Sequence, residues 1–337
     1  MVMFSRHPKL VSTAAPLRIS YAGGGTDFPD HYLVHGGRVL STTIDRFVYV
    51  NVNRREAGLF NERYRLSYFE AESVQSLDEI RNETARECLK LVPVDEPLHI
   101  STSSDVPASS GLGSSSSFAV ALLLALHELR GDVVSAGQLA DEACEVEIQR
   151  LGRPIGKQDQ FAAAFGGLNS IAFETSGRVT VHPLWLPDGG IKQLFDSTAL
   201  VWTGVQRPSQ SVLSEQKSRV SKNVGLLNDL TQLALDCELE ISGGGDVAAG
   251  IGAILRRGWE LKKGLASNVA DSDIDGLAHI ADQSGAWGSK ICGAGAGGFL
   301  LVLGAPHSIS ALTNAVAPRA VLRPMYEPRG ARVIAVV

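Results

Sequence analysis

The chain has 337 residues, 44% of them hydrophobic and 20% charged, so it is long enough to bury a sizeable core and to form about two domains. Its formal net charge of −5 gives no electrostatic reason to expect nucleic acid as a partner. Basic residues form no run longer than a pair such as Lys262-Lys263, a pattern typical of a solvated surface. The longest apolar run, 118–126, is shorter than the roughly 20 residues that span a bilayer.

The cysteines and the start of the chain indicate a reducing compartment. No two cysteines form a CxxC pair, so we expect reduced thiols and neither disulfides nor a zinc site. The start of the chain, MVMFSRHPKL, has no apolar stretch that would serve as the core of a signal peptide. These features predict a cytoplasmic protein without a membrane partner, and they carry no signal of oligomeric state.

The N-terminal half mixes strand-like and helix-like segments. Short segments with β-branched or alternating residues and flanking breakers predict strands at 16–21, 37–44, 47–53 and 98–102. Apolar spacing and caps predict helices over 77–91, over 114–130, and from a cap at Ser135 through Leu151. Two further segments, 166–173 and 178–184, predict a β-hairpin.

The pattern changes near residue 195. A predicted strand at 199–203 is followed by three helical stretches between 209 and 284, strands on both sides of the glycine run 293–298, a helix over 308–317 and a closing strand at 332–337. Strands and helices do not alternate as they do in a parallel βαβ sheet, which favours an α+β fold. We place two domains at 1–194 and 195–337.

The first of three glycine-rich loops lies in PLRISYAGGGTDFPDHY, residues 16–32. Three consecutive glycines after a strand let the backbone approach a ligand closely, because no Cβ stands in the way. Gly24 and Gly25 are followed by Thr26 and Asp27, whose hydroxyl and carboxylate suit the hydroxyls of a sugar. The alternative is a plain tight turn in which the aspartate caps a helix.

The second loop, SSDVPASSGLGSSSSFAVA at 103–121, leads directly into a predicted helix. Unpaired N–H groups and the positive end of the dipole make a helix N-terminus a good phosphate site. One serine would suffice as a cap, so a purely capping role leaves the two glycines of the loop unexplained. The residues expected at the nucleotide phosphates are Ser109, Ser110, Gly111, Leu112, Gly113, Ser114 and Ser115.

The third loop, CGAGAGG at 292–298, matches G-x-G-x-x-G and raises the alternative of an NAD-dependent oxidoreductase. A dinucleotide-binding loop should open a helix, whereas the strand-like FLLVLG follows here. The sequence GRPIGKQ at 152–158 resembles a P-loop, but it is one residue short and lacks the serine or threonine after the lysine. Neither motif therefore predicts its usual nucleotide site.

Two carboxylates are candidates for chemistry. Asp159 lies where a polar turn gives way to an apolar stretch, and it is either a first-turn helix acid or a base that takes the proton of an acceptor hydroxyl. Glu147 is either a solvated helix charge or a ligand of Mg²⁺, which favours one or two carboxylates. The residues alone leave both pairs of alternatives open.

Taken together, these loops resemble those of the GHMP kinases, the superfamily of galactokinase, homoserine kinase, mevalonate kinase and phosphomevalonate kinase. The family's phosphate loop, Pro-x-x-x-Gly-Leu-Gly-Ser-Ser, matches residues 107–115. The resemblance implies ATP and Mg²⁺ as cofactors, with Ser115 and Glu147 on the metal. It also implies Asp159 as the catalytic base and Arg18 as its basic partner. A permanently charged guanidinium there would keep the carboxylate ionised and offset charge on the transferred group.

The resemblance further implies the two-domain GHMP fold. In that fold an N-terminal α+β ATP-binding domain and a ferredoxin-like C-terminal domain hold the active site between them. The glycine run then becomes a third motif, in which Gly293 and Gly295 close over the phosphates and the substrate.

Within the superfamily, the strings LRISYAGGGTD and IGKQDQFAAAFGGLN look like those of the heptose 7-phosphate kinases. This likeness implies a small sugar phosphate as substrate: the anomeric hydroxyl of D-glycero-D-manno-heptose 7-phosphate would be phosphorylated to the 1,7-bisphosphate. Sugar 1-kinases of the fucokinase or galactokinase type are the alternative, and a non-catalytic sugar-binding regulator is a second one. Lys157, Arg207 and Lys290 are unranked candidates for holding the second phosphate of the substrate.

Overall fold

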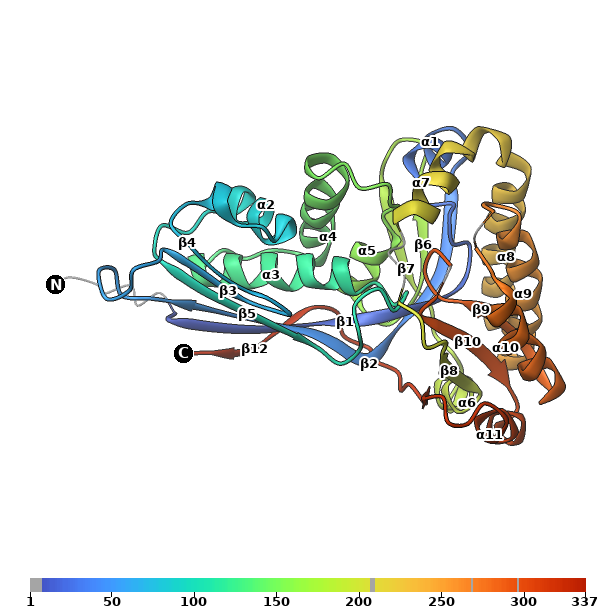
Figure 1. The fold of residues 1–337 in the computed structure, drawn as a ribbon. Helices are drawn as coiled ribbons and strands as arrows, with labels where there is room; N and C mark the ends of the chain where they lie inside the picture. The colour runs from blue at the N-terminus through green and yellow to red at the C-terminus, as the bar shows by residue number, and fades with distance from the viewer. Residues whose placement is uncertain (1–7, 207–209, 268, 296) are drawn as a thin grey trace.

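Two β-sheets with covering helices form the described part of the chain (Figure 1). The computed structural model describes residues 8–337, except 207–209, 268 and 296. The first sheet contains β1 (Leu10–Ala22), β2 (Gly37–Arg54), β3 (Tyr64–Ser67), β4 (Ala71–Val74), β5 (Leu98–Ser104), β6 (Leu168–Phe173), β7 (Val179–Pro183) and β12 (Arg332–Val336). The second contains β8 (Thr198–Trp202), β9 (Ala286–Ile291), β10 (Phe299–Gly304) and β11 (Val321–Leu322).

The strand pairing is mainly antiparallel. The first sheet has the order β12-β1-β2-β5-β3-β4, and β6 pairs with both β2 and β7. Within the described part of the chain, only β3 and β5 run parallel. The second sheet has the order β11-β8-β10-β9. Mainly antiparallel sheets with helices packed on them confirm the predicted α+β class.

A single bent strand replaces two predicted ones. The predicted strands 37–44 and 47–53 are continuous in β2, which pairs with β1 along its length. The register shifts opposite Pro16 and Leu17, so that Asp45 and Arg46 bulge out of the ladder. A bulge bends a strand without ending it, which is why this polar pair resembles a break in the sequence.

Four helices lie on one side of the first sheet (Figure 1): α2 (Glu83–Leu91), α3 (Ser114–Arg130), α4 (Ala136–Cys144) and α5 (Gln158–Phe165). The predicted helix over 114–130 is confirmed by α3, which packs on β1 and β2. It is apolar on most sides because α2, α4 and α5 cover the faces that the sheet leaves free.

Two other predicted helices are interrupted. The segment 77–91 consists of a 3₁₀ turn, η1 (Leu77–Glu79), and of α2, which starts at a new cap, Asn82. Ser135 caps α4 as predicted, since its Oγ accepts a hydrogen bond from Gln138 N at 3.1 Å. Beyond Cys144 the helix widens into a π-helical turn, η2 (Glu145–Arg150). Such turns interrupt regular spacing and are frequent at functional sites.

Between residues 209 and 284, where three helical stretches were predicted, the described residues form four α-helices: α7 (Gln210–Ser218), α8 (Val224–Gly243), α9 (Val247–Lys263) and α10 (Ser272–Gln283). Helices α8 and α9 pack on each other, and both also reach β1, so they link the two sheets (Figure 1). The remaining helices are α1 (Pro29–His35), α6 (Gly190–Asp196), η3 (Val220–Lys222) and α11 (Pro306–Ala315).

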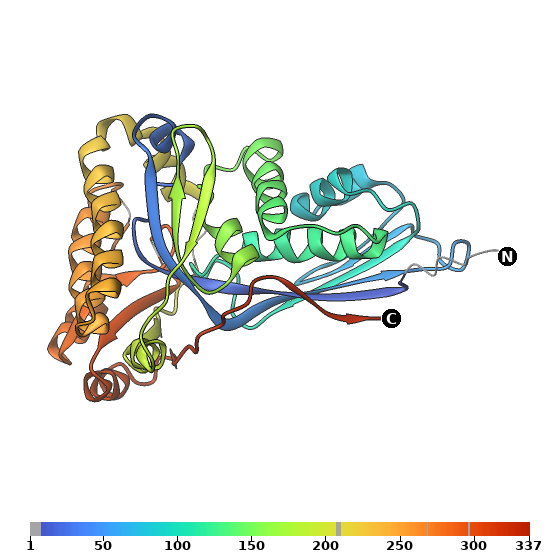
Figure 2. The ribbon, with the colours of Figure 1, turned by 180° about the vertical axis from the view of Figure 1, so that it is seen from behind.

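The last strand returns to the first sheet. Figure 2 shows β12 crossing back from the second sheet to lie beside β1. The division at residue 195 remains a prediction. The second sheet begins just after it, at β8, but the last strand of the chain, β12, belongs to the first sheet. None of the helices in the described ranges combines the length and the apolar character that crossing a membrane requires.

Candidate active site

A pocket of about 460 Å³ lies where the three glycine-rich loops meet. The end of β1, the N-terminus of α3, the N-terminus of α5 and the β9–β10 loop all contribute to its walls. Helix α9 adds one residue from its last turn. Segments from both halves of the chain therefore build a single site.

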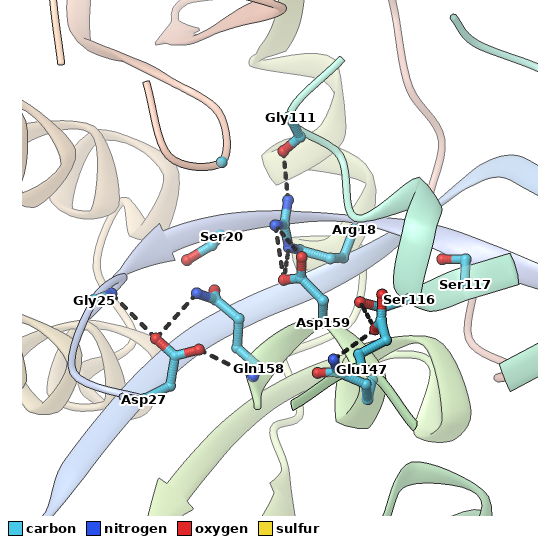
Figure 3. A network of polar contacts seen from close by, with 12 residues as sticks. Arg18, Ser20, Gly25, Asp27, Gly111, Ser116, Ser117, Glu147, Gln158 and Asp159 are labelled. Carbon is cyan, nitrogen blue, oxygen red and sulfur yellow. Dashed lines mark hydrogen bonds and ion pairs between the residues drawn. The ribbon is translucent and has the colours of Figure 1, made fainter. Parts of the chain in front are cut away.

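Arg18 and Asp159 form a bidentate ion pair at the centre of this pocket (Figure 3). Arg18 Nε donates to Asp159 Oδ1 at 2.7 Å, and Nη2 donates to Oδ2 at 2.8 Å. The third nitrogen, Nη1, donates to the carbonyl oxygen of Gly111 at 2.6 Å. The guanidinium thus ties the carboxylate to the second glycine-rich loop. The two residues are 141 positions apart in the chain, and the fold brings them together as the family resemblance implies.

The pair has one buried partner and one accessible partner. The side chain of Arg18 is 6% exposed, while that of Asp159 is 25% exposed. Asp159 lies in the first turn of α5, where a carboxylate is stabilised by the helix dipole. A ligand in the pocket therefore reaches the carboxylate, and the guanidinium fixes the orientation of that carboxylate from behind.

The second loop presents an open helix N-terminus. Ser109, Gly111 and Gly113 have positive φ angles of 56°, 81° and 81°. Gly113 is the N-cap of α3 and offers no side chain to its first N–H groups. These N–H groups remain available to a ligand, as the phosphate-loop prediction requires.

The structure separates the predicted phosphate-loop residues into two groups. Ser109, Gly111, Gly113, Ser114 and Ser115 line the pocket. The other two predicted residues are fully buried and do not line it: Ser110 and Leu112. Their part in the loop is structural, since the carbonyl oxygen of Leu112 accepts from Arg18 N and that of Ser110 accepts from Phe299 N, both at 3.1 Å.

Glu147 is a fully buried carboxylate with four side-chain partners. Oε1 accepts from Ser115 Oγ at 2.7 Å and contacts Arg153 Nη1 at 2.8 Å. Oε2 accepts from Ser116 Oγ at 2.6 Å and from Gln160 Nε2 at 2.7 Å (Figure 3 labels Ser116 and Glu147). The solvated-charge alternative for Glu147 is therefore wrong, since none of its side chain is exposed.

The donor set around Glu147 fits a small cation. Ser115 Oγ and Glu147 Oε1 converge on one position, which Arg153 Nη1 occupies at 2.9 Å and 2.8 Å from them. A hydroxyl and a carboxylate oxygen are hard ligands of the kind that Mg²⁺ takes alongside phosphate oxygens and water. The described residues contain no cluster of three or more His, Cys, Asp or Glu side chains that could hold a metal ion. A metal ion that is also bound by phosphate oxygens does not need such a cluster.

Asp27 is held inside the first loop rather than exposed to solvent. Its Oδ1 accepts from Gly25 N and from Gln158 Nε2, both at 3.2 Å, and its Oδ2 accepts from Gln158 N at 3.1 Å (Figure 3). Burial raises the pKa of Asp27, and the neighbouring carboxylate of Asp159 raises it further. The side chain still lines the pocket beside Gly24 and Gly25.

Thr26 serves the turn and does not line the pocket. Its Oγ1 donates to Gly23 O at 2.8 Å and accepts from Arg38 N at 3.1 Å, and the side chain is fully buried. Of the four residues predicted in this loop, the structure therefore brings Gly24, Gly25 and Asp27 to the site, and Thr26 supports them from behind.

The third loop packs on the second through glycines. A Cβ on Gly293 would lie 2.8 Å from Gly111 Cα, and a Cβ on Gly298 would lie 2.3 Å from Ser110 O. The strand β10 follows, which confirms that this loop opens no helix and removes the dinucleotide-binding alternative. Both Gly293 and Gly295 line the pocket, as predicted for a loop that closes over the ligand.

Lys262 contradicts the solvated-surface interpretation of the basic pairs, and Lys290, a candidate for holding a second phosphate, is buried as well. Lys262, from the last turn of α9, is 6% exposed, and Lys290, from β9, is 5% exposed. Burial lowers the pKa of Lys262 to about 8 and that of Lys290 to about 7. Both line the pocket. Lys263 does lie at the surface, where it pairs with Glu260.

Of the other two candidates for a second substrate phosphate, the structure describes only Lys157. Lys157 directs its Nζ over the ring of Tyr32, 5.6 Å from the centroid, and does not line the pocket. Arg207 lies outside the described residues.

Sequence reasoning missed Gln158, Arg153 and Lys262. Gln158 directly precedes Asp159, so its position beside the base was a usable signal. Arg153 belongs to a segment dismissed as an incomplete P-loop, and Lys262 to a pair assigned to the surface. The helical period offered a signal for Lys262. Leu255 and Trp259 precede it by seven and three residues, so they lie on the same face of α9, and both are buried.

Comparisons with known proteins agree with this geometry. Residues 77–167 match the family model described as the GHMP kinases N terminal domain. A D-glycero-alpha-D-manno-heptose 7-phosphate kinase of Campylobacter jejuni is 32% identical over 305 residues, covering 87% of this chain and 88% of the relative. An L-fucokinase/L-fucose-1-P guanylyltransferase of Bacteroides fragilis is 25% identical over 338 residues, covering 88% of this chain but 34% of that longer protein.

A solved structure shows the same likeness in three dimensions. The crystal structure of a D-glycero-D-manno-heptose 1-phosphate kinase from Bacteroides thetaiotaomicron superposes with a TM-score of 0.80 at 26% identity, covering 97% of this chain and 99% of that one. The fold, the site and these relatives define an ATP-dependent sugar kinase, a phosphotransferase with an alcohol group as acceptor. The chain belongs to the GHMP kinases, which confirms the family resemblance drawn from its loops.

Proposed function

We propose that this enzyme transfers the γ-phosphoryl group of ATP to the anomeric hydroxyl of D-glycero-D-manno-heptose 7-phosphate and forms the 1,7-bisphosphate. The observation that carries the proposal is the Arg18–Asp159 pair, which lies directly beside the open N-terminus of α3 in one pocket. The 32% identical heptose 7-phosphate kinase supports the choice of sugar. The proposal includes a cytoplasmic location, where ATP is available.

The residues of the site have separate roles in this mechanism. Asp159 accepts the proton of the anomeric hydroxyl as its oxygen bonds to the γ-phosphorus, and the bond to the bridging oxygen of ADP breaks. Arg18 orients that carboxylate through two hydrogen bonds and offsets negative charge on the group in transfer. Asp27 accepts hydrogen bonds from ring hydroxyls. An anomeric hydroxyl is more acidic than an ordinary alcohol, which suits a carboxylate base.

Mg²⁺ would be held by Ser115 and Glu147, and it would supply charge neutralisation at the nucleotide phosphates. Arg153 stands in that position and would have to leave it. A guanidinium on a flexible side chain, 27% exposed, has room to do so. It would then remain next to the phosphates as a second positive charge.

A fucokinase-type activity is the second candidate, because the Bacteroides fragilis relative covers 88% of this chain. The two activities differ in their use of a second phosphate. In the heptose reaction, binding energy from the 7-phosphate orients the reacting hydroxyl, so the sugar without it should react far more slowly and not merely bind more weakly. A fucose kinase shows no such dependence.

A panel of sugars decides between them. ATP consumption is measured with heptose 7-phosphate, free heptose, fucose and galactose at equal concentration. We expect the phosphorylated heptose to react fastest. Preference for free fucose would contradict the heptose proposal and leave the kinase class intact. The product needs its phosphate positions assigned by ³¹P NMR, because one structural relative is described as a 1-phosphate kinase.

A further inference from the structure

Two lysines in the pocket have no role in the mechanism above. Lys262 lies in the last turn of α9, and Lys290 is the second-to-last residue of β9, so they reach the pocket from two elements of the C-terminal half. Their side chains come from rigid secondary structure and not from a loop. Such an origin suits residues that hold a ligand in a fixed position.

Neither lysine has a carboxylate partner among the residues that the structure describes. Lys262 Nζ donates to the carbonyl oxygen of Gly293, and no carboxylate lies within ion-pair distance of it in the part of the chain that the structure describes. The ammonium group of Lys290 has neither a carboxylate partner nor a hydrogen bond among those same residues. Buried ammonium groups without partners are costly, so they are rare unless a ligand supplies the missing charge.

The surrounding charges leave an excess of positive charge on this side of the pocket. Lys262 interacts with Arg18 and with the carboxylates of Asp27 and Asp159, and Lys290 interacts with Lys262 and Arg18. Asp159 is engaged by Arg18, while Asp27 is engaged by amide donors. Three cations therefore face two carboxylates, and neither carboxylate is directed to a lysine.

We propose that Lys262 and Lys290 together bind a phosphate group inside the pocket. A dianionic tetrahedral group accepts charge-assisted hydrogen bonds from both ammonium groups and supplies the charge that their environment lacks. The inference rests on the proposed function, which offers two sources for this chemistry. One is the phosphate already on the sugar, and the other is the phosphoryl group in transfer.

The variants Lys262→Met and Lys290→Met remove the charge and keep most of the length of the side chain. The control is Lys263→Met, which makes the same change one residue along α9, on a partly exposed side chain paired with Glu260. Lys262→Met also removes the contact to the Gly293 loop, so a loosened loop alone could lower activity. Lys290 makes no such contact, and Lys290→Met therefore decides the question.

Steady-state kinetics with heptose 7-phosphate and with the free heptose distinguish the two sources. If the lysines bind the sugar's phosphate, kcat/KM for heptose 7-phosphate falls about 10- to 100-fold and that for free heptose stays within about 3-fold. If they bind the group in transfer, kcat falls equally with both sugars, while calorimetric affinity for heptose 7-phosphate is unchanged. Both outcomes support the site.

The site is overturned if folded Lys290→Met keeps kcat and KM near wild type with both sugars, as we expect of Lys263→Met. A second readout needs no turnover: the melting temperature is titrated with inorganic phosphate. We expect a smaller rise for the two variants than for wild type, and an equal rise would overturn the site. If wild type phosphorylates none of the sugars, the proposed function fails and this titration still tests the lysines.

Discussion

Asp159 is oriented by Arg18, whose side chain is held in one position by burial and hydrogen bonds. Arg18 is almost fully buried and uses three nitrogens on two acceptors, the carboxylate of Asp159 and the carbonyl oxygen of Gly111. A bidentate contact fixes the plane of the carboxylate as well as its distance. The base is therefore positioned before any substrate binds, and little reorganisation is needed during proton transfer.

Asp159→Asn should lower kcat by about 10²-fold or more, because an amide cannot accept the proton of the acceptor hydroxyl. The amide oxygen still accepts from Arg18, so we expect the fold and ATP affinity to be retained. Turnover, calorimetric ATP binding and the circular dichroism spectrum are the measurements. Asp141→Asn, an exposed change in α4, is the control. A near-wild-type kcat would assign Asp159 to helix stabilisation alone.

Lys290 makes stability depend on pH in the absence of phosphate. Burial lowers its pKa from 10.5 to about 7 in the folded protein. Below pH 7 both folded and unfolded states carry the proton, so the full cost of the buried charge is present. As the pH rises from about 7 toward 10.5, the folded lysine is already neutral and the unfolded one loses its proton, so this cost disappears.

Lys290→Met should therefore raise the melting temperature at pH 6.5, and the gain should shrink steadily up to pH 10. Thermal unfolding of wild type and variant in phosphate-free buffer measures the difference. Lys263→Met should show no comparable trend, since that side chain is partly exposed and paired with Glu260. A gain that is constant across this pH range would mean that the lysine is not buried as a cation.

At the scale of the elements, the π-helical turn and the loop after it build the cation position. Glu147 lies in η2, and Arg153 follows in the loop that leads to α5. Arg153 Nη1 contacts both Glu147 and Ser115, which are the two residues proposed for Mg²⁺. A metal ion held by these two residues would therefore compete with the guanidinium for the same oxygens.

Removing this competitor should lower the Mg²⁺ requirement. Arg153→Gln is expected to reduce the half-saturating Mg²⁺ concentration about 3- to 10-fold, which corresponds to one partly screened charge interaction. Glu147→Gln should raise it while changing the KM for sugar little. Activity is measured against Mg²⁺ at saturating ATP and sugar, with Arg150→Gln as the control from an exposed ion pair in the same turn. A raised requirement in Arg153→Gln would instead show that this arginine helps to bind the nucleotide.

The elements that were predictable are those with strong local signals. The predicted and observed bounds of α3 agree, because its apolar run contains no glycine or proline and the helix begins directly after Gly113. The 3₁₀ turn before α2 and the π-turn after α4 depend on tertiary packing, and local spacing does not encode them. The bulge in β2 is likewise set by its partner strand.

The candidate site divides in the same way. Glycine-rich loops and the residues in them are visible in the sequence because backbone conformation and close approach require glycine. Burial of a lysine at a helix end depends on what packs against it, and a pair of lysines at the C-terminus of α9 is equally compatible with a solvated face. For this reason Asp159 and Gly111 were predictable, and the buried state of Lys262 was not.

At the scale of the whole molecule, the end of the chain supports the helix that carries the base. After leaving the second sheet, the chain passes under α5 before β12 pairs with β1 (Figure 2). Ala331 N donates to the carbonyl oxygen of Ala163 at 2.9 Å, within α5. Gly330 fits so closely there that a Cβ would lie 2.0 Å from Ala164 O. The C-terminal end of α5 is therefore held by a segment more than 160 residues later.

Gly330→Ala tests whether this support also positions Asp159 at the other end of the helix. A methyl group at 2.0 Å from a carbonyl oxygen forces the segment or α5 to move, which should lower the free energy of unfolding by about 1–3 kcal/mol. A small shift of the base should also lower kcat and leave the affinity for ATP unchanged, because α3 is not displaced. Gly276→Ala, on the exposed face of α10 with open space around it, is the matched control and should be neutral or slightly stabilising. Loss of stability with an unchanged kcat would show that the tail anchors the fold without positioning the base.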